Sequence, residues 1–241
     1  MEAECADTPR GSAPGRSRMY PLVPRYHSPS PARYPPLVML AVFVAIACVL
    51  GIDPWYRRDW ALENLIVVVS LPVLMLGYRT LRFSNGAYFC IFVLFVAHEI
   101  GAHYTYAEVP YDAWTTRWFG FSITEQFGFA RNHYDRLVHF LYGVLATPAL
   151  VELVRARMRP RGLWVWILAL SLVLSQAALY ELLEWAAALL FGGDLGEAYL
   201  GTQGDPWDAH QDMALAPLGA LLTLVYLRLR GHLHNPAVQT R

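Results

Sequence analysis

Apolar residues recur along this chain in six long runs that polar segments separate. The runs occupy residues 37–52, 65–78, 88–102, 137–154, 163–191 and 213–227. A helix needs roughly 20 mainly apolar residues to cross a bilayer, and flanking aromatic and small residues extend the shorter runs toward that length. The pattern therefore predicts an all-α, polytopic membrane bundle of about six transmembrane helices, which form a single domain over residues 35–230.

The two ends of the chain lack this pattern. Residues 1–34 are rich in Pro, Ser, Gly and Arg and show no apolar periodicity, so we expect a disordered tail there, with a second short tail at residues 231–241. The first apolar run begins too far from the N-terminus for a secretory signal, and we expect no cleavage.

Composition excludes several functional classes. The chain is 56% hydrophobic and only 16% charged, whereas soluble domains are about one-quarter charged. Its net charge is zero and it has neither a zinc-finger spacing nor a basic helix, so nucleic acid is not an expected partner. Cys5, Cys48 and Cys90 are isolated, which indicates neither a disulfide framework nor a thiolate metal site.

Arginines predict the orientation of the bundle. Most of them precede the first run, lie between the second and third or between the fourth and fifth runs, or follow the sixth run. In this order they are Arg10, Arg16, Arg18, Arg25 and Arg33, then Arg79 and Arg82, then Arg155, Arg157, Arg159 and Arg161, then Arg228 and Arg230. Because positive loops stay inside, both termini should be cytoplasmic. Residues 53–63, 104–134 and 192–208 should form the outer loops.

The long outer loop is dense in aromatic residues between positions 107 and 130. They are Trp114, Trp118, Phe119, Phe121, Phe127 and Phe129. Such side chains prefer the headgroup region, so we expect this segment to lie on the outer membrane surface, partly helical or re-entrant. It is either an anchor without chemistry or a lid that admits a lipid-like molecule sideways.

Ionisable residues gather at the outer ends of four predicted helices. They are His98, Glu99 and His103; Arg131, Asp135, Arg136 and His139; Glu181 and Glu184; and Asp205, Asp208 and Asp212. Several are spaced three or four apart and so share a helix face. Each ionisable group costs roughly 2.5 to 3.5 kcal/mol within a bilayer on insertion scales, so a set this large should be mutually paired in a common interior. We predict one site built from four helices.

The residue types fit a divalent metal ion. We take His98, His103, His139, Glu181, Glu184, Asp208 and Asp212 as candidate metal ligands, for Zn²⁺, Mn²⁺ or iron. The candidate catalytic residues are Glu99, Asp135, Arg136 and Asp205. Three hypotheses follow: a metal-dependent enzyme that acts on a lipid or lipid-linked envelope substrate, a transporter or binding protein for a cation or amine, and a structural ion-pair network around Arg131 and Arg136. No HExxH, nucleophile elbow or P-loop selects a reaction.

Four motifs resemble those of the YjdF-like family of bacterial inner-membrane proteins. They are HEIGAHYTY at residues 98–106, RNHYDRLVHF at 131–140, YELLEW at 180–185 and GTQGDPWDAHQDM at 201–213, and the resemblance extends from about residue 37 to 229. It implies a multi-pass helical fold in the inner membrane and no particular reaction. A fainter similarity to VanZ-like membrane proteins involves Asp135, Arg136, His139, Phe140, Glu184, Asp208, Asp212 and Gly219, with Ala216 where that pattern has asparagine.

Overall fold

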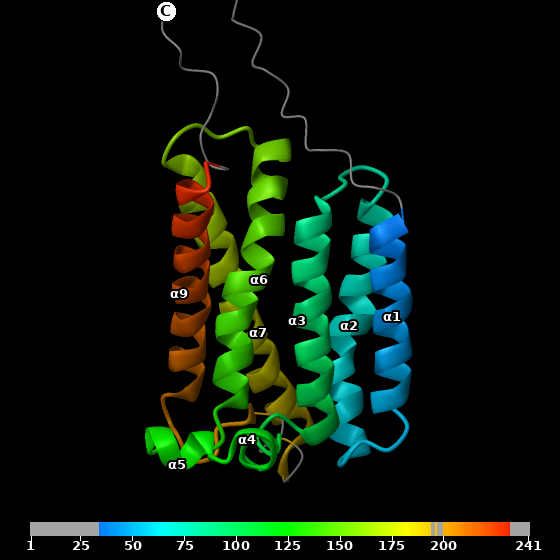
Figure 1. Ribbon diagram of the computed structural model, residues 1–241, viewed down its shortest axis with the longest axis vertical. Coiled ribbons are helices and arrows are strands. Elements are labelled where there is room, and N and C mark those ends of the chain that lie inside the picture. Colours follow the sequence, from blue (N-terminus) through cyan, green and yellow to red (C-terminus); the bar gives the residue numbers. More distant parts are fainter. Residues whose placement is uncertain (1–33, 194–195, 197–199, 232–241) are drawn as a thin grey trace, which may run out of the picture.

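The computed structural model describes residues 34–193, 196 and 200–231. Within them, six long helices stand side by side in one bundle (Figure 1). They are α1 (Tyr34–Leu50), α2 (Arg57–Gly77), α3 (Asn85–Tyr104), α6 (Tyr134–Arg157), α7 (Trp164–Phe191) and α9 (Asp208–Leu229). Five are long and apolar enough to cross a membrane, and α1, with 17 residues, is at the short end of the spanning range. The predicted helical membrane fold is confirmed. The predicted tails lie outside the described residues, except for Tyr34 and Gly231.

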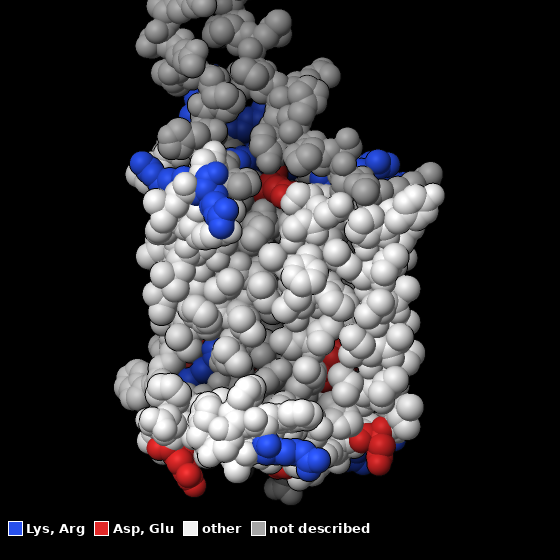
Figure 2. Space-filling model, viewed as in Figure 1, with Lys and Arg blue, Asp and Glu red and all other residues white. Residues whose placement is uncertain are grey.

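The helices bury their own backbone polar groups and expose apolar side chains. Hydrocarbon offers no hydrogen bonds, so a spanning chain must pair its N–H and C=O groups internally, which a helix does. Side chains on the outer face, such as Val68, Leu76 and Leu190, are apolar and exposed. Figure 2 shows the result as a largely uncharged wall between two charged ends. This surface suits a lipid environment.

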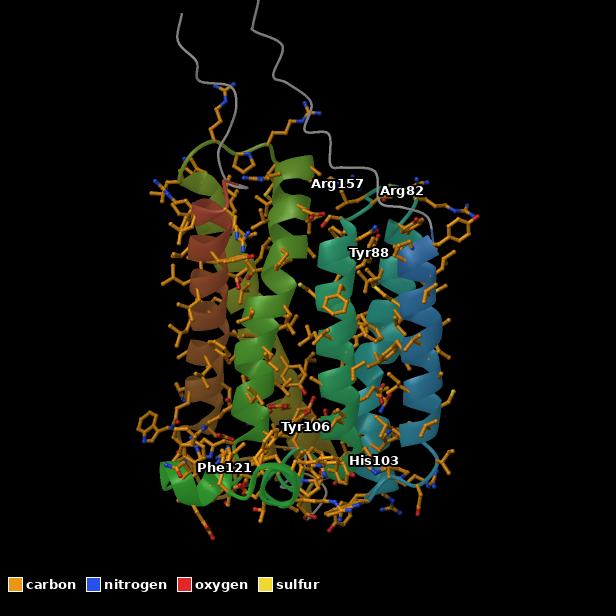
Figure 3. The ribbon with its side chains drawn as sticks, viewed as in Figure 1. Arg82, Tyr88, His103, Tyr106, Phe121 and Arg157 are labelled. Atoms are coloured by element: carbon orange, nitrogen blue, oxygen red, sulfur yellow. The ribbon has the colours of Figure 1, made fainter. Side chains whose placement is uncertain are left out.

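The described arginine-rich segments on which the predicted orientation rests lie at one end of the bundle. Five other arginines belong to elements at the opposite end: Arg57, Arg58, Arg117, Arg131 and Arg136. Arg82 and Arg157 lie at the upper end in Figure 3, whereas His103, Tyr106 and Phe121 lie at the lower end. Which end faces the cytoplasm stays a prediction.

Three helices begin earlier than the apolar runs suggest. α2 begins at Arg57 instead of near residue 65, so most of the segment expected to be an outer loop is helical. α6 begins at Tyr134 and α9 at Asp208. Hydropathy falls wherever inward-facing acids replace apolar residues, although the helix continues. The polar pairs therefore lie inside the bundle on regular helical turns.

Helices α6 and α9 pack almost backbone to backbone. A Cβ atom added to Gly143 would lie 1.8 Å from the Ala216 carbonyl oxygen, and one added to Gly219 would lie 2.3 Å from the Phe140 carbonyl oxygen. Close approach of this kind requires small residues at the crossing. Both helices begin at the lower end of the bundle (Figure 1), so their first turns, which carry acids, lie next to each other.

The aromatic segment between residues 107 and 130 contains two short helices that cross the lower end of the bundle (Figure 1), α4 (Tyr111–Phe119) and α5 (Ile123–Phe127). The expectation of partial helix is confirmed. Asp112 of α4 joins them by accepting hydrogen bonds from Ser122 Oγ at 2.9 Å, the Thr124 backbone N–H at 2.9 Å and Thr124 Oγ1 at 2.5 Å. Partial burial alone would raise the pKa of Asp112, but these hydrogen bonds outweigh it and the pKa lies below the usual value.

Candidate functional site

The centre of the site is an acid and a histidine on α6. Asp135 lies in the first turn, where the helix dipole favours a carboxylate, and His139 lies one turn further on. Both are buried, and His139 Nε2 is 3.6 Å from Asp135 Oδ1. The spacing of four brings them together, as the sequence predicts.

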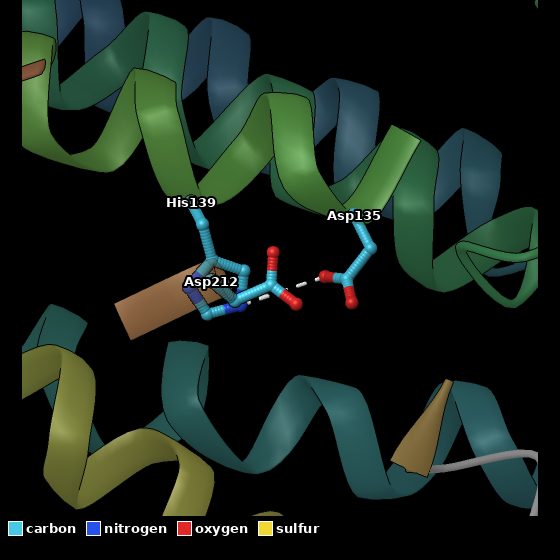
Figure 4. Close-up of side chains that lie close together, drawn as sticks. All are labelled: Asp135, His139 and Asp212. Atoms are coloured by element: carbon cyan, nitrogen blue, oxygen red, sulfur yellow. Dashed lines mark ion pairs between the residues drawn. The ribbon is translucent and has the colours of Figure 1, made fainter. Parts of the chain in front are cut away.

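Helix α9 adds Asp212 to this pair. One ligand atom from each of Asp135, His139 and Asp212 lies within 4.8 Å of the others (Figure 4). Asp212 is only 1% exposed, and its Oδ1 atom accepts no hydrogen bond from the described residues. Metal–ligand distances to imidazole nitrogen and carboxylate oxygen are about 2.1 Å, so small side-chain rotations would let all three bind one ion. We call these three residues the triad.

Helix α7 contributes two more acids. Glu181 Oε1 is 3.4 Å from His139 Nε2 and, like Asp212 Oδ1, is buried without a conventional hydrogen bond in the described part of the chain. Glu184 is buried and interacts electrostatically with Asp135 and Glu181. Glu181 is therefore positioned as a fourth ligand of the same ion, whereas Glu184 interacts with the acids Asp135 and Glu181 and is not placed against His139.

Helix α2 supplies residues that the sequence analysis missed. Glu63 is buried and accepts a hydrogen bond of 3.3 Å from the Tyr180 hydroxyl of α7. Asp59, one turn earlier, accepts one of 3.1 Å from Thr105 Oγ1 at the end of α3. The signal was present, because Asp59 and Glu63 have the same spacing of four as the other pairs. They were overlooked because the hydropathy pattern assigned them to a loop.

Two arginines close the lower end of the cluster. Arg131 Nη2 is 2.6 Å from Asp208 Oδ1, and Arg136 Nη2 is 2.5 Å from Asp205 Oδ2 and 3.4 Å from Asp208 Oδ1. The backbone N–H of Trp207 donates to Asp205 and, together with Arg136, lowers the pKa of this carboxyl. Asp205, Asp208 and both arginines therefore form an ion-pair network that fastens the loop before α9 to the start of α6. Among the predicted metal ligands, Asp208 is the one whose carboxylate forms ion pairs with arginine in the described cluster.

His98 is held by two neighbours instead of facing the triad with a free nitrogen. Its Nε2 is 3.2 Å from the Glu63 carbonyl oxygen, and its Nδ1 is 2.5 Å from the Tyr106 hydroxyl. If Nε2 carries the proton, it donates to the carbonyl and Nδ1 accepts from the phenol. Burial, followed by nearby carboxylates, raises the pKa of Tyr106 well above the usual value, so this phenol remains a donor.

Glu99 and His103 lie outside the cluster. His103 Nδ1 is 2.7 Å from the Leu50 carbonyl oxygen at the end of α1, and its ring packs on Tyr104. Glu99 is fully buried, and its carboxylate oxygens have no conventional hydrogen bond within the described chain, although the Asn64 amide of α2 interacts with it. The structure thus brings together the predicted residues of α6, α7 and α9, whereas those of α3 lie beside or away from the triad.

Acids outnumber bases in the assembled cluster. Six carboxyl groups interact with one another, and two guanidinium groups accompany them: the acids are Glu63, Asp135, Glu181, Glu184, Asp208 and Asp212. Their mutual repulsion in a medium of low dielectric constant is too large for all of them to be ionised without compensation. Bound protons or a bound cation must offset the excess, and the triad has the ligand types that a divalent ion takes.

A cavity connects this cluster with the side of the bundle. Its volume is about 350 Å³, and His98, Tyr106, Asp135 and His139 line its polar end. Ile66 of α2 and Leu179 and Leu183 of α7 line its side and are themselves exposed on the outer wall of the bundle. Ser70, Tyr142 and Gln176 add polar groups further along the cavity. We call this cavity the lateral groove. It leads from the membrane-facing surface to the acids.

Comparison with known proteins gives two matches. Residues 35–232 match the family described as "Predicted membrane protein (DUF2238)". The chain is 35% identical over 198 residues to the inner membrane protein YjdF of Escherichia coli (strain K12), a match that covers 80% of this chain and 90% of that protein. No solved structure matches the chain. The four sequence motifs all lie within the matched range.

Proposed function

The chain belongs to the DUF2238 family of predicted membrane proteins, and we propose that it is a membrane-embedded enzyme that uses a divalent metal ion to act on a lipid or lipid-linked substrate. It is a multi-pass protein of the inner membrane, so a substrate in the same bilayer would be within its reach. Neither the family description nor the name of the relative specifies a reaction.

The observation that carries the proposal is the buried triad. Asp135, His139 and Asp212 offer one imidazole and two carboxylates within 4.8 Å, and the Asp212 Oδ1 atom has no hydrogen-bond partner among the described residues. A buried, unpaired carboxylate oxygen is costly in a protein interior, and a metal ion would remove that cost. Imidazole favours zinc or iron, and carboxylates suit manganese.

An enzyme also needs an open coordination position. Three protein ligands leave room for water or substrate in the arrangement typical of catalytic metal sites. Glu181, 3.4 Å from His139 Nε2, could act as a further ligand or as a general base toward metal-bound water. The lateral groove supports a lipid-like substrate because it joins the triad to the lipid-facing wall.

Metal retention tests the proposal. Protein purified in detergent should retain about one equivalent of zinc, manganese or iron by elemental analysis. His139→Ala and Asp212→Asn should each abolish this retention, because each removes a ligand of the proposed ion. Asp112→Asn is the matched control, since it removes a carboxylate at the same end of the molecule that is committed to hydrogen bonds between α4 and α5. Wild-type protein without stoichiometric metal, after purification without chelators, would refute the metal centre.

A second function, binding or transport of a cation or amine without chemistry, is favoured by the excess of carboxylates over arginines. The two functions differ in what happens to the lipid. Membrane lipids from cells that overproduce the wild type should contain a product that is absent with His139→Ala. Unchanged lipids, together with proton-dependent uptake of a cation by proteoliposomes, would favour transport instead.

A further inference from the structure

We infer that the lateral groove binds one acyl chain of a phospholipid and delivers its phosphate group to the triad; this inference rests on the proposed metal centre and names its substrate class. The groove runs along the bundle axis. It extends from Asp135 to Tyr142 on α6 and from Leu183 back to Gln176 on α7. At 1.5 Å per residue, each stretch is about 10 Å long.

The groove is most polar at one end and apolar in its middle. At that end, Asp135, His139, His98 and Tyr106 present charged and hydrogen-bonding groups, whereas Leu94, Val138 and Ala177 present hydrocarbon along its length. Tyr142 and Gln176 line the other end, where the Tyr142 hydroxyl donates a hydrogen bond to Gln176 Oε1 and the two polar groups satisfy each other. A ligand that matches both parts has a polar head and an extended apolar tail. The groove's volume of about 350 Å³ corresponds to roughly a dozen groups the size of a water molecule. This is enough for part of one acyl chain and too little for an entire two-chain lipid, whose other chain would stay in the bilayer.

The entrance lies between α2 and α7. Ile66 of α2 and Leu179 and Leu183 of α7 line the groove, and 43%, 56% and 55% of their surfaces are exposed. All three are in helices of membrane-spanning length and apolarity. Because these side chains face lipid on one side and the groove on the other, a chain can enter sideways without crossing water.

The orientation of the groove matches that of a lipid in one leaflet. Its polar end is at the lower end of the bundle, where Figure 3 places Tyr106, and its apolar part extends toward the middle of the span. A lipid of the leaflet at that end has its headgroup and chain in the same order. By the orientation that the arginines predict, this is the outer leaflet.

The proposed divalent ion would favour phosphate as the headgroup chemistry. The carboxylates around the triad would repel a free anion, but a bound divalent ion with open positions binds phosphate oxygens, as metal ions do in many phosphate-handling sites. Arg131 and Arg136 are already paired with Asp205 and Asp208, so a metal ion bound at the triad would be the positive partner for phosphate. Phosphate recognition should therefore depend on the metal, whereas chain recognition should not.

The test is photocrosslinking in phosphatidylcholine proteoliposomes. One probe is phosphatidylglycerol with a diazirine on an acyl chain, and the other is diacylglycerol with the same labelled chain. We expect the phosphatidylglycerol probe to label Leu94 and Val138 several-fold more than the diacylglycerol probe. Chelation of the metal should remove that difference. Equal labelling by both probes in the metal-loaded protein would overturn phosphate recognition.

Two tryptophan variants of α7 provide the matched pair. Leu183→Trp fills the entrance of the groove and should reduce labelling of Leu94 several-fold. Leu182→Trp adds the same bulk to a neighbouring residue that is 58% exposed and does not line the groove, so labelling should stay at the wild-type level. The thermal stability of both variants establishes that they fold. Uniform labelling of all lipid-facing residues, or equal effects of the two variants, would overturn the inference.

Metal content measured on the same samples separates the two proposals. Stoichiometric metal with uniform labelling refutes the groove as a lipid site and leaves the metal centre standing. Selective labelling of the groove without any metal refutes the metal centre, and with it metal-dependent phosphate recognition, while chain binding survives.

Discussion

Glycine at position 101 determines how the polar end of the groove is built. A Cβ atom there would lie 2.6 Å from Cζ of Tyr106, whose ring rests directly on the α3 backbone. Thr105 and Tyr106 both have positive φ, 55° and 40°, which turns the chain back so that the phenol reaches His98. Such backbone conformations are strained for non-glycine residues, and Asp59 supports this one by accepting from Thr105 Oγ1. One glycine and one acid thus orient a histidine next to the triad.

We predict that Gly101→Ala displaces the Tyr106 ring and lowers the free energy of unfolding by about 1–3 kcal/mol, which is typical of overpacking. The measurement is thermal or denaturant unfolding in detergent. Gly77→Ala is the control, because a Cβ atom at that helical glycine meets nothing within 4 Å, and its stability should be unchanged or slightly raised. Equal stability of Gly101→Ala and wild type would contradict the close packing of Tyr106.

At the scale of the elements, two helix pairs perform different tasks. The α6–α9 pair is closely packed, because Gly143 and Gly219 allow backbone contact, and this packing places His139 next to Asp212. The α4–α5 pair lies across the lower end and exposes Trp118, Phe119 and Phe127. The Asp112 carboxylate, with its three hydrogen bonds, makes most of the polar contacts within this pair, and the Tyr111 hydroxyl adds a weaker one to Thr124 Oγ1 at 3.3 Å. The stability of this second pair should therefore depend on pH.

The pKa of Asp112 predicts the direction of that dependence. Its pKa is lowered in the folded protein, so its contribution is fully present above the unfolded value of about 3.9 and is lost as pH falls through the folded pKa. Hydrogen exchange at the Thr124 amide, corrected for the intrinsic rate, should lose protection below about pH 4. In Asp112→Asn, protection should be low and independent of pH. Glu125→Gln, which alters an exposed acid of the same pair, should behave as wild type; the same loss of pH dependence in that variant would rule out Asp112 as the cause.

At the scale of the whole molecule, charge is distributed along the bundle axis. Most of the described arginines lie toward the upper end, and the buried acids of the cluster lie near the lower end, where exposed charged side chains of both signs are also found (Figure 2). An apolar wall separates the two ends (Figure 2). This asymmetry orients a membrane protein during insertion, since positive segments remain in the cytoplasm. It would also direct the lateral groove to the outer leaflet.

We predict that an impermeant thiol reagent labels Glu125→Cys but not Arg157→Cys in intact cells, each in a background without Cys5, Cys48 and Cys90. Both positions are exposed, one at each end of the bundle. Labelling of both after permeabilisation is the control for accessibility. The reverse pattern in intact cells would place the triad at the cytoplasmic side and invert the topology.

The sequence by itself determined the class of this protein and most of its helices. A long apolar segment in lipid must pair its own backbone N–H and C=O groups, which a helix does. The number and approximate position of the helices therefore follow from hydropathy. Periodicity also predicted that Asp135 and His139 meet, because residues four apart on a helix must share a face. The acids of α7 and α9 were found for the same reason.

Only the tertiary structure decided which of these residues share one site. His98 and His103 are imidazoles like His139, yet neither joins the triad. His98 is hydrogen-bonded to Tyr106 and to a carbonyl group, and His103 contacts the carbonyl oxygen of Leu50 at the end of α1. Glu63 joined the cluster although hydropathy had placed it in a loop. A residue's periodicity defines its face on its own helix, but helix rotation and the neighbours on other helices are set by packing, here by the glycines of the α6–α9 crossing. That packing brings Asp212 beside His139, and this proximity cannot be predicted from the local sequence of either helix.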